Sequence, residues 1–420
     1  MSRVSSCFQT TVLASLCTLA WACSDGSPTG PVQEIPGLPR SLSLNEELVV
    51  SAGNDFAFRF LDQVYRTAPD SNLFLAPLSA SMALGMTMNG AAESTYDEMR
   101  NTLGFGSMTL EQINQGYRDL IDLLLTLDPS VEMGIGNSIW YREGFPVRTD
   151  FLDRTRSFFD AEISALDFSD PGAADIINAW VRGETNGKIQ GIVDPPIHPL
   201  TVMFLINAIY FKGDWTHRFP KDKTVQATFS GLNGVSGPVP LMELRDTLLY
   251  AETDSYQAVD LPYGGKAFSM TVLLPKAGAS IQELVASLNP SGWNQIVGGL
   301  TRKEGTVYLP RFRMEWEREL NDDLKAMGMV VPFGGGANFS GLSDEALQRG
   351  LYISKVKQKT YVDVNEEGTE AAGVTSVEIR EFVNPDHFVV RADRPFLFLI
   401  RERFSQTILF AGVLVEPPGV

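Results

Sequence analysis

The chain has 420 residues, of which 44% are hydrophobic and 20% charged, and its formal net charge is −17 at pH 7. This length exceeds the usual size of one compact core, so two lobes or one large mixed domain are both compatible with it. The acidic balance argues against nucleic acid as a partner, because phosphate binding requires clustered Lys and Arg.

The three cysteines, Cys7, Cys17 and Cys23, all lie at the N-terminus. The rest of the chain therefore has no disulfide, no cysteine nucleophile and no thiolate metal site. A large core, rather than disulfides, is expected to stabilise the fold.

Residues 1–22 have the pattern of an export signal. Arg3 gives a basic start, residues 8–22 are largely apolar or small, and Ala20-Trp21-Ala22 is a small-x-small cleavage pattern. Small residues before a cysteine resemble a bacterial lipoprotein signal, in which Cys23 becomes the lipidated first residue. The alternative is an ordinary secretory signal that is cut after Ala22.

Residues 23–45 are predicted to be the lipidated Cys23 and a disordered tether. The stretch 24–40 is rich in Ser, Gly and Pro, as linkers are. No later stretch reaches the ~20 apolar residues of a spanning helix. We expect an exported protein, either a lipoprotein of the bacterial envelope or a secreted extracellular one. Ser24, rather than Asp, after the cysteine favours the outer membrane or the cell surface.

Helices are predicted to dominate the first half of the chain that follows the tether. Helical apolar spacing predicts a helix over 45–68. A short apolar run closed by Pro77 follows, and Ser79 is expected to cap the next helix, which ends near Asn89-Gly90. A further short helix is predicted from Thr95 to Leu103.

Strands dominate the second half, so the fold class is α+β. The run 201–211 is nearly all apolar and is expected to be a central strand that is buried on both faces, in which Asn207 must find polar partners. The other predictions are listed in chain order: strands at 131–141, 238–251, 256–263, 267–275, 305–314, 352–365, 387–400 and 406–416, and helices at 281–289 and 316–327.

Residues 363–380 form an unusual segment. The stretch begins like a strand and breaks at Glu366-Glu367-Gly368. Read with a period of two, the residues that follow place every charge on one face. The neutral face holds Thr369, Ala371, Gly373, Thr375, Val377 and Ile379, and the other holds Glu370, Ala372, Val374, Ser376, Glu378 and Arg380. The segment alone fits either an exposed acidic loop or a strand buried on one side.

Enzyme chemistry finds little support in the sequence. The three histidines, His198, His217 and His387, lack ligand spacing, so no metal site is expected. No Gly-x-Ser-x-Gly elbow occurs, and neither Gly134-Ile135-Gly136 nor residues 183–188 complete a nucleotide-binding loop. We expect no enzymatic activity and no cofactor, with a carboxylate-pair enzyme as the open alternative.

Five runs, in this order, resemble the serpin family, and the resemblance covers nearly all of residues 46–417. They are Asn72 to Met88 (a buried strand and helix B), Asn178 to Ile189 (the segment after helix F), Leu205 to Trp215 (strand 3 of sheet A), Ser354 to Thr375 (strand 5 of sheet A and the hinge) and Val390 to Ile400 (the C-terminal signature).

The resemblance implies a serpin fold and a trapping mechanism. We expect a single domain over 46–420 with a large mixed sheet A, further sheets B and C, eight or nine helices and an exposed reactive-centre loop at about 366–388. In this family a target protease cuts the loop, and the freed hinge then enters sheet A as a new strand, dragging the acyl-linked protease with it.

From Thr369 onward, the hinge that the resemblance implies carries no charge on the face to be buried, and it contains no proline. Its residues are Glu366, Glu367, Gly368, Thr369, Glu370, Ala371, Ala372, Gly373, Val374 and Thr375. A buried unpaired charge would slow entry, so the composition favours an inhibitory member.

The family's spacing places the scissile bond between Phe382 and Val383, which suits a chymotrypsin-like or elastase-like target. Arg380-Glu381 is the alternative and suits a trypsin-like one. Counting back from Pro395 gives a position near Asn384. Phe382 could instead anchor the loop on the body.

The polar cluster that resists premature opening of sheet A is implied at Ser79, Asn207 and Gln358, and Trp215 matches the tryptophan where insertion begins. The chain departs from the family at Ala76, where serine is common, and at Gln358, where histidine is common. Because Gln358 does not titrate, we expect sheet opening to depend little on pH between 5 and 8.

The expected partners are a target serine protease, held covalently, and a membrane through Cys23, with the protein monomeric. Two other functions remain open from the sequence. The loop could inhibit a cysteine protease, or the protein could be a non-inhibitory serpin that acts as a binding protein.

Overall fold

The computed structural model describes residues 33–369 and 387–417, which belong to one compact unit. Ten α-helices lie in these residues, one or two more than expected: α1 (Leu44–Thr67), α2 (Pro77–Met88), α3 (Glu93–Thr102), α4 (Leu110–Thr126), α5 (Thr149–Phe159), α6 (Ala173–Glu184), α7 (Ile281–Ser287), α8 (Pro290–Gly299), α9 (Asn321–Ala326) and α10 (Ala346–Arg349).

The strands alternate with these helices early and dominate later, as an α+β fold requires. They are β1 (Leu73–Leu75), β2 (Val131–Arg142), β3 (Glu162–Leu166), β4 (Met203–Asp214), β5 (Val225–Ser230), β6 (Ser236–Glu252), β7 (Tyr256–Tyr263), β8 (Phe268–Pro275), β9 (Thr301–Pro310), β10 (Phe312–Glu319), β11 (Lys357–Val364), β12 (Gly368–Thr369), β13 (Phe388–Arg391), β14 (Phe396–Glu402) and β15 (Ile408–Leu414).

Two sheets organise the described residues. The six-stranded sheet has the order β10-β11-β12-β4-β2-β3 and is mixed, because β2 and β3 run parallel while its other pairs are antiparallel. It contains β4 and β11, so it is the expected sheet A. The expected sheets B and C form one continuous path, β1-β15-β14-β8-β7-β6-β9-β13, with β5 also paired to β6.

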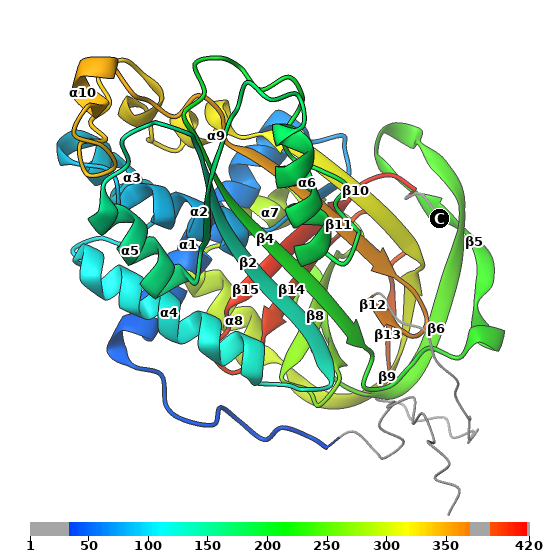
Figure 1. Ribbon diagram of the computed structural model, residues 1–420. Coiled ribbons are helices and arrows are strands. Elements are labelled where there is room, and N and C mark those ends of the chain that lie inside the picture. Colours follow the sequence, from blue (N-terminus) through cyan, green and yellow to red (C-terminus); the bar gives the residue numbers. More distant parts are fainter. Residues whose placement is uncertain (1–32, 370–386, 418–420) are drawn as a thin grey trace, which may run out of the picture. The chain divides into compact units, whose positions relative to one another are not determined.

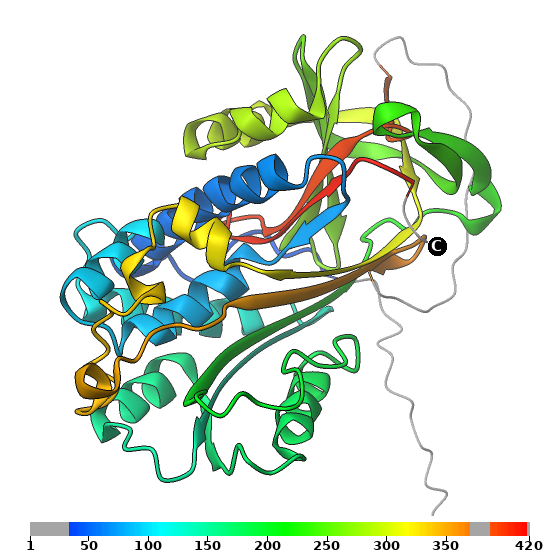
Figure 2. The same cartoon turned by 90° about the horizontal axis from the view of Figure 1, so that it is seen from above.

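The sheets and helices stack in layers (Figures 1 and 2). Figure 2 shows α5 and α6 on one face of sheet A, and α1 and α2 on its other face. The strands β14 and β15 follow behind α1 and α2, and α7 and α8 cover the far side. The helix α2 thus lies between sheet A and β15 in the middle of the molecule, where its burial on nearly every side explains its mostly apolar sequence.

Local sequence signals fix several helix starts. Ser43 accepts a hydrogen bond from the backbone N–H of Glu46, whose carboxylate accepts from the backbone N–H of Ser43, so α1 begins with a capping box. Thr109 and Gln112 form the same device at the start of α4. No helix in the described part of the chain is both long and apolar enough to span a bilayer.

Four predicted elements need correction. Ser79 does not cap α2: the helix begins at Pro77, and Ser79 lies inside it. The predicted strand at 305–314 is two strands that separate at Arg311 and belong to different sheets. The predicted helix at 316–327 starts late, because β10 continues to Glu319 before α9 begins. The predicted strand at 387–400 is likewise two strands, β13 and β14.

The segment before α1, residues 33–43, lies on the domain. Ile35, Leu38 and Leu42 pack against the core, and both Arg40 guanidinium Nη atoms donate to the buried Glu46 carboxylate at 2.7 Å. More than half of the tether that was expected over residues 23–45 is therefore fixed to the body.

Candidate functional site

The hinge is the centre of the candidate site. Its residues Gly368 and Thr369 form the short strand β12, which is antiparallel to β11 on one side and to β4 on the other. Thr369 faces Val364 and Gly213, and Gly368 faces Asp214. A Cβ at position 368 would collide with the backbone of Gly213 and Asp214, so only glycine fits this close approach. The beginning of a strand between β4 and β11 is therefore present at Gly368 and Thr369.

Thr369 points into the interior and is only 3% exposed. Its hydroxyl lies 2.7 Å from the phenolic oxygen of Tyr263. The Tyr263 ring stacks on Trp215 with ring centroids 4.4 Å apart, and the indole N–H of Trp215 donates to the backbone carbonyl of Asn365 at 2.9 Å. Trp215 and Tyr263 thus form the pocket that receives the first neutral residue of the hinge.

Two glutamates hold the chain just before β12. The Glu366 carboxylate accepts hydrogen bonds from Arg311 and from the hydroxyl of Thr224, and Glu367 forms an ion pair with Lys221. Burial raises the pKa of Glu366, but the hydrogen bonds from Arg311 and Thr224 outweigh it and hold the pKa below its ordinary value.

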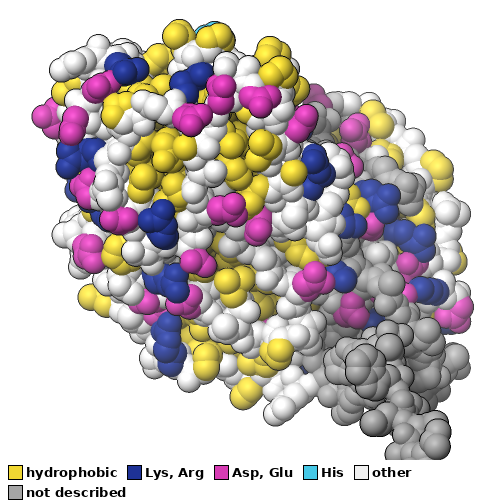
Figure 3. Space-filling view, viewed as in Figure 1, with side chains coloured by type: hydrophobic (Ala, Val, Ile, Leu, Met, Phe, Trp, Pro, Cys, Tyr) yellow, Lys and Arg dark blue, Asp and Glu magenta, His cyan; other side chains and the backbone are white. Residues whose placement is uncertain are grey.

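Backbone bonds complete the anchor. The N–H of Trp215 donates to the carbonyl of Glu367 at 2.8 Å, and the N–H of Phe219 donates to that of Glu366 at 2.9 Å. In the space-filling view, acidic and basic side chains are interspersed on the face that carries sheet A (Figure 3), which fits carboxylates that are paired one by one.

A second polar cluster links α2 to both strands that border the entry path. On one side, Gln358 of β11 accepts from the backbone N–H of Ala76 at 3.1 Å and donates to its carbonyl at 2.8 Å. On the other side, the Ser79 hydroxyl donates to the carbonyl of Asn207 of β4 at 3.2 Å. Parting β4 from β11 must therefore break contacts to α2.

The amide of Asn207 also ties β4 to its other neighbour. Its Nδ2 donates to Oδ1 of Asn137 at 2.8 Å, and Asn137 donates to the carbonyl of Phe159 at 2.7 Å. The Oδ1 atom of Asn207 is buried without a partner, so the polar group inside this strand is only half satisfied. Of the two polar atoms in the Asn207 side chain, only Nδ2 therefore has a hydrogen-bond partner of the kind that was expected.

Between β4 and β11 an apolar cavity continues the line of β12. Its lining includes Ile209 and Phe211 of β4, Val362 of β11, and Phe410 of β15. At its outer side, the Lys188 ammonium lies 5.1 Å from the ring centroid of Tyr361. The cavity between β4 and β11 is therefore lined by apolar side chains toward the core and by the Lys188 ammonium toward α6.

Comparisons with known proteins agree with this geometry. The family model described as "Serpin (serine protease inhibitor)" matches residues 51–417. The chain belongs to the serpin family. Iripin-2 of Ixodes ricinus is 33% identical over 376 residues, covering 87% of this chain and 93% of that protein.

Solved serpin structures match over most of the chain as well. Human thyroxine-binding globulin, complexed with thyroxine, has a TM-score of 0.81 at 29% identity and covers 89% of this chain and all of its own. The thermophilic serpin tengpin in the native state has a TM-score of 0.80 at 28% identity, covering 92% of this chain and 98% of its own. Serpins are mostly protease inhibitors rather than catalysts, but some are not inhibitors.

Several predicted site residues lie outside the described part of this serpin. These are the hinge from Glu370 to Thr375, the predicted scissile pair Phe382-Val383, the alternative Arg380-Glu381, and Cys23. Of the predicted site, the structure brings together Trp215 with residues 366–369, and Gln358, Ser79 and Asn207 around α2.

Sequence reasoning missed the partners of the hinge. Tyr263, Lys221, Thr224 and Arg311 are far from it along the chain, and no spacing links them to it. One signal was available. Two adjacent acidic residues next to a strand that must be buried require cationic partners.

Gln358 is expected to restrain sheet A. Gln358→Ala leaves the N–H and the carbonyl of Ala76 unpaired in a buried site, which costs about 1–3 kcal/mol. We expect faster heat-induced polymerisation and insertion of a synthetic hinge peptide, with a native fold by circular dichroism. Lys359→Ala on the same strand is the matched control, because Lys359 is only partly buried and its partner is Glu317 rather than α2. Equal rates for the Gln358→Ala variant and the unmodified serpin would contradict this role.

The polymerisation rate should change little between pH 5 and 8. The folded-state pKa of Glu366 is lowered, so its anchor contributes fully above the unfolded value of about 4.5. That contribution is lost as pH falls through the folded-state pKa. Rates measured from pH 3.5 to 8 should therefore be flat above 5 and rise below about 4.5.

The control for this pH profile is Gln358→His. It places a group that titrates near pH 6.5 in the cluster around α2 and should introduce a slope between pH 5 and 8. A steep slope in the same window for the unmodified serpin would contradict the account of Gln358 and Glu366.

Proposed function

We propose that this serpin is an irreversible suicide inhibitor of serine endopeptidases, with Phe382-Val383 as the scissile bond and a chymotrypsin-like or elastase-like target. The observation that carries the proposal is β12. Gly368 and Thr369 already pair with β4 and β11, so the hinge is aligned with the path along which the cut loop would enter.

The two faces of the hinge sequence fit the two sides of that path. Residues Thr369, Ala371 and Gly373 belong to the neutral face, and Thr369 points toward the core. Continuing the register of β12 directs the same face at the apolar lining around Phe211 and Val362. In an inserted strand with this register, the charged face, beginning with Glu370, would point outward.

The chemistry of trapping requires no catalytic group of the inhibitor. The protease serine hydroxyl attacks the carbonyl carbon of Phe382, the bond to the nitrogen of Val383 breaks, and the new amine takes a proton. An ester between the protease and Phe382 remains. Entry of the hinge into sheet A then moves and distorts the protease before water hydrolyses the ester.

An SDS-stable complex tests this proposal. The protein is mixed separately with chymotrypsin, elastase, trypsin and papain, and we expect a band at the summed mass with chymotrypsin or elastase. Phe382→Arg should transfer complex formation to trypsin, which identifies the scissile position. Cleavage without any complex by all four proteases would instead support a non-inhibitory binding protein, and a complex with papain alone would support a cysteine-protease inhibitor.

We also propose that the serpin is exported as a monomer and lipidated at Cys23. The support is the sequence of residues 1–23. Labelling of growing bacteria with a fatty-acid analogue should mark the protein, and Cys23→Ala should abolish the label. An unlabelled protein in the medium would favour the secretory alternative.

A further inference from the structure

The segment before α1 leaves the domain at one specific place. Residues 33–43 (the strap) run from the start of α1 to the turn between β7 and β8, along the lower edge in Figure 1. There the N–H of Ile35 donates to the carbonyl of Gly265 at 2.7 Å, and the Lys266 ammonium binds the Glu34 carboxylate at 2.7 Å.

The fit at this turn is close. A Cβ at position 265 would lie 2.7 Å from the backbone oxygen of Gln33 and 3.1 Å from Ile35, so the strap fits against a glycine. A hydrogen bond, an ion pair and this backbone approach together fix Gln33 on the turn.

The same turn borders the hinge. The N–H of Gly264 donates at 2.8 Å to the carbonyl of Asp214, which is the sheet partner of Gly368. Tyr263 immediately precedes the turn and carries the hydroxyl that meets Thr369. The strap therefore ends beside the first residues of the reactive loop, whereas α10 lies at the opposite end of the molecule in both views (Figures 1 and 2).

The length of the preceding chain limits where an anchor can lie. Nine residues lie between Cys23 and Gln33, and the ten steps from one Cα to the other span at most about 35 Å when fully extended. A domain of this size is about 55 Å across, and a typical serine protease of roughly 230 residues about 45 Å. A lipid at Cys23 thus cannot reach around the domain to its far end.

We infer that an anchor at Cys23 holds the end of the molecule that carries the reactive loop toward the membrane, so that the loop meets proteases that act at the lipid surface. A soluble protease is wider than the gap that the tether can open between the domain and the membrane. Its docking on the loop is therefore hindered. The inference rests on the proposed inhibition and on attachment at Cys23. Its test compares two attachment sites, and the comparison is valid whether or not the protein inhibits and whether or not cells lipidate Cys23.

The test attaches the protein to vesicles chemically, whether or not cells lipidate it. In the chain without the predicted signal, residues 23–420, Cys23 is the only cysteine. It can be coupled to phosphatidylcholine vesicles that contain a maleimide lipid. The matched control carries Cys23→Ser and Leu347→Cys, because Leu347 is exposed on α10 at the far end.

The readout is the rate at which soluble chymotrypsin consumes the intact chain through the reactive loop. We expect a several-fold lower rate for attachment at Cys23 than for attachment at position 347, and equal rates for the two proteins in solution. A Gly/Ser insertion of about 20 residues after Ser24 adds up to about 70 Å of reach and should restore the rate on vesicles.

Equal rates for the two attachment sites would overturn the inference. Failure of the proposed inhibition is seen separately, because the consumed chain would then appear only as cleaved product without an SDS-stable complex. The rate comparison between the attachment sites remains valid in that case.

Discussion

Replacing Thr369 with arginine is expected to turn this serpin from an inhibitor into a substrate. Thr369 is 3% exposed, bonded to Tyr263, and paired with both β4 and β11. A guanidinium there must either remain buried without a carboxylate, at a cost of several kcal/mol, or hold the hinge out of the sheet. Proteolytic cleavage of the loop does not depend on entry of the hinge, so it should proceed at the normal rate.

The measurement is the fraction of protease recovered in SDS-stable complex against the fraction of chain merely cleaved. We expect Thr369→Arg to reduce the complex to a few per cent or less, because several kcal/mol corresponds to a slowing of entry by about 10² or more. Thr369→Val keeps the volume and the neutrality and should retain most of the complex, with a modest loss from the unpaired Tyr263 hydroxyl. An unchanged yield of complex for Thr369→Arg would contradict entry at this position.

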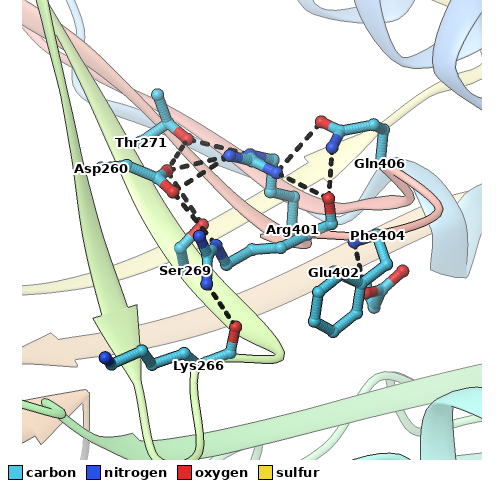
Figure 4. Close-up of polar contacts among 9 residues, drawn as sticks. Asp260, Lys266, Ser269, Thr271, Arg401, Glu402, Phe404 and Gln406 are labelled. Atoms are coloured by element: carbon cyan, nitrogen blue, oxygen red, sulfur yellow. Dashed lines mark hydrogen bonds and ion pairs between the residues drawn. The ribbon is translucent and has the colours of Figure 1, made fainter. Parts of the chain in front are cut away.

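Removing the guanidinium of Arg401 is expected to give the largest loss of stability. Arg401 and Asp260 form a fully buried ion pair between β14 and β7, with Arg401 Nη2 donating to both carboxylate oxygens at 3.0 and 3.1 Å (Figure 4). Ser269 and Thr271 also donate to Asp260, at 2.9 and 2.6 Å. Arg403 lies 3.4 Å away. Among these partners, Arg401 alone contacts both carboxylate oxygens of Asp260.

Arg401→Ala leaves the buried Asp260 carboxylate with only Arg403 as a cationic partner, at 3.4 Å, which costs up to about 3–5 kcal/mol. The melting temperature of the uncut protein should fall by several degrees. Arg66→Ala is the matched control, because its ion pair with Asp62 is exposed and is worth less than about 1 kcal/mol. The double variant Asp260→Leu with Arg401→Met should recover much of the loss, and equal melting of Arg401→Ala and Arg66→Ala would contradict a buried network of this strength.

The strands that periodicity defines best were predicted closely. β7 matches the predicted 256–263, and β8 and β15 agree within two residues at each end, because their apolar runs are bounded by turn residues. Thr369, the first residue of the neutral face, points inward as predicted, whereas the rest of both faces lies outside the described residues. These features depend on neighbouring residues and an alternating backbone, which the sequence alone displays.

Features that depend on distant contacts were not predictable in the same way. Ser79 looks like a helix cap locally, but the helix begins two residues earlier, and its hydroxyl serves Asn207 of β4 instead. The break at Arg311 between β9 and β10 leaves no turn signature, because it is set by the change from one sheet to the other. The docking of residues 366–369 depends on Arg311, Lys221 and Tyr263, which only the folded chain brings near.

The account rests on an intact fold that lies above its lowest free energy. Entry of about ten further hinge residues would add on the order of ten ladder hydrogen bonds, each worth about 1 kcal/mol. For a domain of this size, about 10 kcal/mol corresponds to a rise of roughly 13 °C in melting temperature.

Scanning calorimetry of the intact protein and of the protein cut within the reactive loop measures this directly, with Thr369→Arg cut in the same way as the control. The account predicts that the cut chain melts about 13 °C or more above the intact one and that the control gains much less. A cut chain that melts at or below the temperature of the intact chain would contradict strand entry, and with it the proposed trapping of a protease.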